Sequence, residues 1–282
     1  MIIDSHQHFW QVGKFDYPWM SSKLGVLYRD YLPEMLEPIL NENGVAKTIL
    51  VQASNSLSET EWLLNLADQY QFIAGVVGWV DLTSSGMSEQ LDTFKANPKF
   101  KGVRHLVESE PAADWLVQPP VLLGLQILEQ QGVAYDLLVH TRHLQHVKAV
   151  AETCPRLRLV VDHMAKPPIA GGEITAWASG LREVAAYPNV SCKLSGLVTE
   201  AMHNSWRTED LRPYVEKALE FFGPNRLIFG SDWPVCLLAA PYSRVLETFQ
   251  SLMRELSDEE RTMIFGGNAA TFYQLQLGAS AA

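Results

Sequence analysis

The chain has 282 residues, of which 47% are apolar and 19% charged, the mix of a globular protein rather than a disordered one. Its 32 acidic and 22 basic residues give a formal net charge of −10, which argues against sequence-independent binding to nucleic acid or to an anionic membrane surface. No apolar run is long enough to span a membrane, and the first residues lack the basic and apolar regions of a signal peptide.

Short apolar runs alternate with longer amphipathic stretches along the whole chain. Several of the runs are apolar at successive positions, as in parallel strands that are covered on both faces. In chain order, the eight predicted strands are residues 1–4, 48–53, 72–80, 102–106, 134–139, 157–162, 190–194 and 227–230.

Helical periodicity fills the intervals between these strands. In residues 57–70 apolar side chains recur at three- and four-residue spacing, and Ser58 followed by Glu61 predicts a capping box at the start of that helix. Ser257 followed by Glu260 predicts another late in the chain. Eight strand–helix units in fewer than 300 residues predict a (β/α)8 TIM barrel of the α/β class. The alternative is an open doubly wound sheet, but the first strand–helix turn has no glycine-rich phosphate motif.

No linker or charge block divides the chain, so we expect one domain over residues 1–282. Three cysteines, Cys154, Cys192 and Cys236, lie far apart and are odd in number. They predict free thiols in a reducing cytoplasm and no disulfide framework.

Polar residues at the carboxyl ends of barrel strands are the first candidates for chemistry, because barrel sites form there. The first strand runs into His6 and His8, which point to one side because side chains alternate along a strand. His163 follows the sixth strand and Asp232 follows the eighth. Taken singly, each of these residues is better explained by a structural role, as a hydrogen-bonded histidine or as a turn or helix-cap aspartate. Together they predict one converging cluster that can hold a metal ion.

Further polar residues follow other strands. Arg104, His105 and Glu108 come at or after the end of the fourth strand, and Lys193 lies near the end of the seventh. They are candidates for binding a substrate or polarising its carbonyl. The alternative is a set of structural ion pairs with Glu108 or Asp162.

Three more residues are candidates for substrate contact. His140 follows the fifth strand, Trp10 lies in the long first connection, and Trp233 stands beside Asp232. Aromatic faces suit the C–H faces of a sugar ring, although most aromatic residues simply pack in cores.

Motifs along nearly the whole chain resemble the amidohydrolase superfamily. They are His6-x-His8, GVRH at 102–105, VVDHMAKP at 160–167, CKLSGL at 192–197, FGSDWP at 229–234 and GNAATFY at 267–273. More narrowly, they resemble the branch of TIM-barrel hydrolases that holds L-fuconolactonases, L-rhamnonolactonases and the pyrone-dicarboxylate lactonase. The resemblance implies a distorted barrel whose site holds His6, His8, His163 and Asp232.

The same resemblance bears on the metal. Binuclear members of the superfamily use a carboxylated lysine at the end of the fourth strand, where this chain has Arg104 and His105. We therefore expect at most one divalent ion, zinc if any, bound by some of His6, His8, His163 and Asp232. Some members of the branch bind one zinc and others work without metal, so its requirement stays open.

The resemblance implies hydrolysis of a sugar lactone, such as L-fuconolactone, to the aldonic acid. Asp232 would activate water and then protonate the leaving oxygen, while His6, His8 and His163 polarise the carbonyl through zinc or by direct hydrogen bonds. The alternatives are a decarboxylase of the same superfamily, a pyrone-dicarboxylate hydrolase and, less favoured by an intact His/Asp cluster, a non-catalytic sugar-binding barrel. We expect a cytoplasmic protein that binds a small lactone but no nucleic acid or membrane, either as a monomer or as a homo-oligomer.

Overall fold

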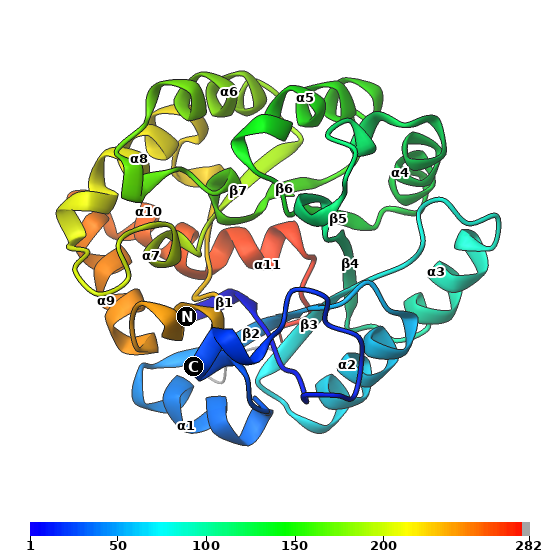
Figure 1. Cartoon of the computed structure of the whole chain (residues 1–282), viewed down its shortest axis with the longest axis horizontal. Helices are drawn as coiled ribbons and strands as arrows, with labels where there is room; N and C mark the ends of the chain where they lie inside the picture. Colours follow the sequence, from blue (N-terminus) through cyan, green and yellow to red (C-terminus); the bar gives the residue numbers. More distant parts are fainter. Residues whose placement is uncertain (278–282) are drawn as a thin grey trace.

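Eight parallel strands form a barrel in this computed structural model, which describes residues 1–277. The strands follow one another around the barrel in sequence order, as the predicted TIM barrel requires (Figure 1). They are β1 (Ile2–Gln7), β2 (Val45–Val51), β3 (Ile73–Gly78), β4 (Phe100–His105), β5 (Ala134–Leu137), β6 (Leu159–Val161), β7 (Val190–Leu194) and β8 (Leu227–Phe229). The fold prediction is confirmed. The single domain predicted over 1–282 includes residues 278–282, which lie outside the described residues.

Helices surround the strands (Figure 1). Their buried apolar side chains pack in the core against the strands. The main ones are α1 (Pro33–Glu42), α2 (Leu57–Gln69), α3 (Met87–Lys95), α4 (Pro119–Gln131), α5 (Leu144–Thr153), α6 (Thr175–Ala185), α8 (Thr208–Phe222) and α9 (Tyr242–Leu252). Shorter helices are α7 (Leu197–Glu200), α10 (Asp258–Thr262) and α11 (Asn268–Phe272). Within residues 1–277 no helix is both long and apolar enough to cross a membrane.

The start of α2 differs from the sequence prediction. Ser56, not Ser58, caps the helix, and its hydroxyl accepts a hydrogen bond from the backbone N–H of Glu59 at 3.1 Å. The capping box predicted for Ser58 and Glu61 is therefore wrong by two residues. The carboxyl group of Glu59 also turns inward and accepts hydrogen bonds from the loop after β2. The capping box predicted at Ser257 is confirmed.

The barrel is distorted where β8 meets β1. The backbone N–H of Asp232 donates to the carbonyl of His6 at 2.8 Å, and that of His8 donates to the carbonyl of Trp233 at 2.7 Å. These bonds join the end of β1 to the segment after β8, which is where the motif residues lie. Long-range backbone pairing therefore brings His6, His8 and Asp232 together.

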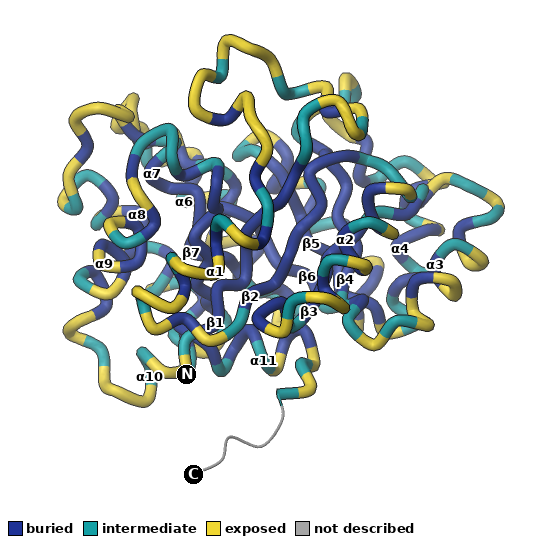
Figure 2. The backbone as a smooth tube through the Cα atoms, turned by 90° about the horizontal axis from the view of Figure 1, so that it is seen from below, coloured by how far each residue is buried: buried dark blue, intermediate teal, exposed yellow. Residues whose placement is uncertain are grey.

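The amino-terminal end of the barrel is filled by α11 and the residues after it. Apolar side chains from the strands pack there against Ala269, Phe272 and Tyr273. Figure 2 shows α11 beneath the strands, with long exposed loops at the opposite end. The polar strand ends therefore face the mouth that those loops surround.

Candidate active site

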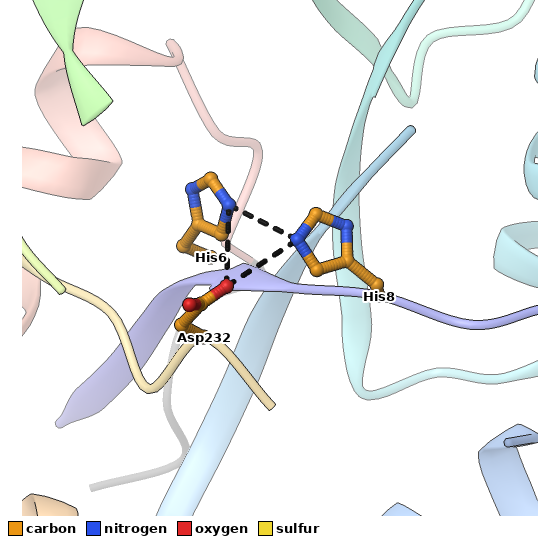
Figure 3. A group of neighbouring side chains, drawn as sticks. All are labelled: His6, His8 and Asp232. Carbon is orange, nitrogen blue, oxygen red and sulfur yellow. Dashed lines mark hydrogen bonds and ion pairs between the residues drawn. The ribbon is translucent and has the colours of Figure 1, made fainter. Parts of the chain in front are cut away.

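Three side chains meet at the mouth of the barrel (Figure 3). The Nε2 atoms of His6 and His8 are 3.2 Å apart, and Asp232 Oδ1 lies 3.8 Å from the first and 3.5 Å from the second. All three side chains are buried. Donor atoms that share a tetrahedral zinc ion lie about 3.4 Å from one another, given bonds of about 2.0–2.1 Å. The set therefore fits one zinc-sized ion.

His163 joins this cluster from the segment after β6. Its Nε2 is 3.9 Å from Asp232 Oδ1, and its Nδ1 is 2.8 Å from the hydroxyl oxygen of Ser195. The four residues from His163 to Lys166 have φ angles between 51° and 59°, in the left-handed region that non-glycine residues avoid. Such strain is typical of functional sites, and here it accompanies the placement of His163 and Lys166 on the lining of one cavity.

The protonation states suit both metal binding and base catalysis. His8 Nδ1 lies 2.8 Å from the carbonyl of Val51, which can only accept, so Nδ1 carries the proton and Nε2 presents its lone pair to the cluster. Burial lowers the pKa of His6, His8 and His163, which favours neutral imidazoles. Burial also acts to raise the pKa of Asp232, but the positive charge that His163 and His8 acquire when they are protonated outweighs it, so this pKa lies below its usual range. Asp232 is therefore a carboxylate near neutral pH.

A buried ion-pair network supports the cluster from inside the barrel. Lys193 Nζ lies 2.5 Å from Asp136 Oδ2, 3.0 Å from Asp162 Oδ1 and 3.1 Å from His6 Nδ1. Arg104 Nη1 lies 3.2 Å from both Asp162 Oδ2 and His6 Nε2. Because buried charges are costly unless they are paired, these contacts explain how so many ionised groups fit within one barrel.

A cavity of about 230 Å³ opens beside the cluster. That volume suits a small ligand, since drug-sized molecules occupy larger pockets. Charged and polar groups and a wall of aromatic and aliphatic side chains share its surface. Its lining residues are His8, Trp10, Trp19, Leu24, Leu27, Ala53, Arg104, Leu106, Glu108, Ser109, Leu138, His163, Lys166, Gly196, Thr199, Glu200, Asp232, Val235 and Leu238.

The structure brings several of the predicted site residues to this cavity. His8, His163, Asp232, Arg104, Glu108 and Trp10 line it. His6 is fully buried against His8 and behind the lining, and Lys193 lies deeper in the ion-pair network.

Three other candidates lie away from the lining. The His105 ring stacks on Trp115, with centroids 4.0 Å apart, and its Nε2 lies 2.6 Å from Glu110 Oε1. Trp233 is buried and packs edge-on against Tyr31. The partly exposed side chain of His140 lies 3.6 Å from Glu108 Oε2.

Among the lining residues that were not assigned a site role from the sequence, three can contact a ligand through a polar or aromatic side chain of particular interest: Trp19, Lys166 and Glu200. Trp19, from the long first loop, donates through Nε1 to the carbonyl of Ala53 at 2.7 Å. Lys166 forms an ion pair with Glu108 at the cavity. Glu200 ends the short helix after β7 and belongs to no recognisable motif. The one feature of the sequence that could have indicated a site role for Glu200 is its position a few residues after the end of a predicted strand.

Comparison with known proteins gives matches over nearly the whole chain. A family model described as amidohydrolase matches residues 3–275. The chain is 41% identical over 277 residues to an L-fucono-1,5-lactonase of Burkholderia ambifaria, covering 97% of this chain and 95% of that protein. It is also 41% identical over 284 residues to an L-fucono-1,5-lactonase of Burkholderia multivorans, covering 97% and 96%. The crystal structure of an amidohydrolase from Burkholderia multivorans with bound zinc has a TM-score of 0.93 and 41% identity, covering 98% of this chain and 99% of that chain.

Proposed function

Because the chain belongs to the amidohydrolase family, we propose that it hydrolyses a sugar lactone of the L-fucono-1,5-lactone type to the aldonic acid. The observation that carries this proposal is the Asp232 carboxylate, which lies beside three imidazoles on a cavity of about 230 Å³. Such a carboxylate can take a proton from water and return it to a leaving oxygen. The activity of the two relatives at 41% identity supports the same reaction.

The donor set fits one zinc ion, which His6 Nε2, His8 Nε2 and Asp232 Oδ1 would hold, with His163 adjacent. When bound, zinc would lower the pKa of a water molecule to about 7 and polarise a carbonyl oxygen. The hydrogen bond from His8 to Val51 fixes the ring in the orientation that ligation needs. Arg104 occupies the end of β4, so we propose one ion and not two.

We assign the proton transfers to Asp232. Its Oδ1 faces the imidazoles, and no described residue forms a hydrogen bond to its Oδ2, which can therefore accept the proton of an attacking water. The water oxygen bonds to the lactone carbonyl carbon, and the bond to the ring oxygen breaks. Arg104 lies on the cavity surface, where its positive charge stabilises the negative charge that develops on the carbonyl oxygen. Asp232 then protonates the released ring oxygen, which completes the addition of one water.

The charges around the cavity favour a neutral substrate. Its lining cations, within residues 1–277, are Arg104 and Lys166, and each already pairs with a carboxylate, Asp162 and Glu108 respectively. A pyrone dicarboxylate would need uncommitted cations, ideally arginines. The same shortage weakens the decarboxylase alternative, whose aromatic acid substrate is also an anion. The aliphatic side chains of Leu24, Leu27, Val235 and Leu238 suit the methyl group of a 6-deoxy sugar.

The cysteines bear on the cellular compartment in which the protein works. All three cysteines are buried free thiols, which supports a reducing compartment, and we place the reaction in the cytoplasm. We expect the protein to act either as a monomer or as a homo-oligomer.

The test is a panel of aldonolactones assayed with a pH indicator, with and without added zinc. Each turnover should release about one proton near neutral pH, because the product acid ionises well below pH 7. We expect L-fucono-1,5-lactone to rank among the best substrates, and metal analysis to find at most one zinc per chain. A higher kcat/KM for a pyrone dicarboxylate, or release of CO2 from an aromatic acid without any lactone hydrolysis, would refute the proposal.

A further inference from the structure

Glu200 lines the same cavity as Asp232, and its carboxyl group lies near enough to Asp232 for that charge to act on it. Glu200 is the last residue of α7, the short helix that begins just after β7 and Gly196. Glu108 and Lys166 line the cavity as well, and the charge of each acts on the Glu200 carboxyl. The side chain is partly buried, so it is removed from much of the solvent.

The neighbours of Glu200 already have partners within the protein. Glu108 forms an ion pair with Lys166, and the Thr199 hydroxyl donates to the carbonyl of Gly196 at 2.7 Å. Among residues 1–277, by contrast, none forms a hydrogen bond or an ion pair with the Glu200 carboxylate. Burial raises the pKa of Glu200, and although Lys166 opposes this effect, the carboxylates of Glu108 and Asp232 add to it. A partly desolvated carboxylate without a partner costs free energy that a ligand can recover.

The chemistry of the group defines that ligand. An ionised carboxylate only accepts hydrogen bonds, and its two oxygens can receive two donors. Neighbouring hydroxyls on a sugar ring supply two O–H donors at a matching separation, and such charge-assisted bonds are stronger than neutral ones. An anionic ligand would instead be repelled. The apolar wall formed by Trp19, Leu24 and Leu238 offers a surface for the less polar side of the same ring.

We propose that Glu200 binds ring hydroxyls of the substrate and thereby determines which stereoisomers of the lactone are accepted. This inference rests on the proposed lactonase function and adds a specificity-determining residue to it. An epimer that turns the relevant hydroxyl away leaves the Glu200 carboxylate unpaired, so the enzyme discriminates against it.

The first test compares wild-type enzyme with Glu200→Gln, which keeps the side-chain size but replaces one acceptor with an NH2 donor. With L-fucono-1,5-lactone we expect kcat/KM to fall by about 10- to 100-fold, the range for one hydrogen bond to a charged group. The change should appear mainly in KM, because the contacted hydroxyls do not react. Glu216→Gln, at an exposed position of α8 outside the cavity, is the matched control and should retain wild-type kinetics.

A series of lactones that each lack one ring hydroxyl then identifies the contact. For at least one member of the series, wild type and Glu200→Gln should have equal kcat/KM values, because the contact is already missing. An equal loss on every lactone, or no loss on any, would overturn the inference. Should Glu200→Gln fail to fold, Glu200→Asp, which retains the charge but shortens the reach, allows the same comparison.

Binding of 1,5-anhydro-L-fucitol, measured by calorimetry, separates this inference from the proposed reaction. This compound keeps the ring hydroxyls but has no carbonyl to attack. If lactones are hydrolysed and Glu200→Gln binds the anhydro sugar as tightly as wild type does, the role of Glu200 is refuted and the reaction stands. If no lactone is hydrolysed but the variant binds the anhydro sugar about 10- to 100-fold more weakly, the reaction is refuted and the role of Glu200 stands.

Discussion

The close approach of Gly196 to His163 links a backbone position to the proposed catalytic cluster of His6, His8, His163 and Asp232. A Cβ atom at Gly196 would lie 2.6 Å from His163 Nδ1, and ordinary contacts begin near 3.4 Å, so the imidazole would have to move by about 0.8 Å. The same Nδ1 lies 2.8 Å from the Ser195 hydroxyl oxygen, and that hydrogen bond would be lost or distorted. The φ of Gly196 is also +66°, a conformation that costs an L-residue about 1–2 kcal/mol.

These two effects predict separate losses for Gly196→Ala. Backbone strain should lower the free energy of unfolding by about 1–2 kcal/mol. Displacement of His163 should lower kcat/KM by about 100-fold, since a misplacement near 1 Å can cost that much. The matched control is Gly132→Ala, because Gly132 has a φ of +67° and its Cβ would meet nothing within 4 Å. It should lose similar stability and retain wild-type activity.

Urea unfolding and steady-state kinetics on both variants provide the assay. Comparing the two variants separates the steric effect on His163 from the strain that both share. Wild-type kcat/KM in Gly196→Ala would refute the proposed catalytic role of His163. An equal loss of activity in Gly132→Ala would show that strain alone accounts for the effect.

Three further predictions follow from the buried charges. Asp232→Asn should fold normally and lower kcat by about 10²- to 10⁴-fold, and near wild-type turnover would place the general base elsewhere. Lys193→Met leaves Asp136 and Asp162 without their shared cation and should destabilise the protein by roughly 3–5 kcal/mol. Asp136→Asn in the Lys193→Met background should restore part of that stability. If Lys193→Met alone were as stable as wild type in urea, the ion pairs of Lys193 would not contribute to stability as proposed. Burial raises the pKa of Glu59 from 4.5 to about 8, so the folded state holds a proton that the unfolded state releases, and stability should fall as the pH rises between these values. The unfolding midpoints measured at pH 5 and pH 8 should differ less in Glu59→Gln than in wild type. An unchanged difference would exclude Glu59 as a source of the pH dependence of stability.

The alternation of apolar runs and amphipathic stretches predicted the (β/α)8 barrel, because strand burial and helical periodicity are local properties of a sequence. The meeting of His6, His8, His163 and Asp232 at one mouth was predicted for a related reason. Parallel strands in a closed barrel all end on the same side, so residues that follow different strands converge.

Tertiary structure decided which of the remaining strand-end residues reach the cavity. Arg104 and His105 are neighbours at the end of β4, but Arg104 lines the cavity while His105 stacks on Trp115. Lys193 lies beneath the site because Asp136, from another strand, and Asp162 supply carboxylates there. These outcomes depend on partners that are distant in sequence.

The loops contributed what no motif predicted. Trp19 reaches the cavity from the long first loop, where its indole donates to the carbonyl of Ala53, and Glu200 reaches it from the short helix after β7. The sequence around Trp19 and Glu200 has no periodic pattern that predicts where these side chains lie, because the course of such a connection depends on the surfaces that it packs against. The sequence alone therefore determined the barrel and the predicted metal ligands, whereas packing between distant segments decided which side chains surround the cavity.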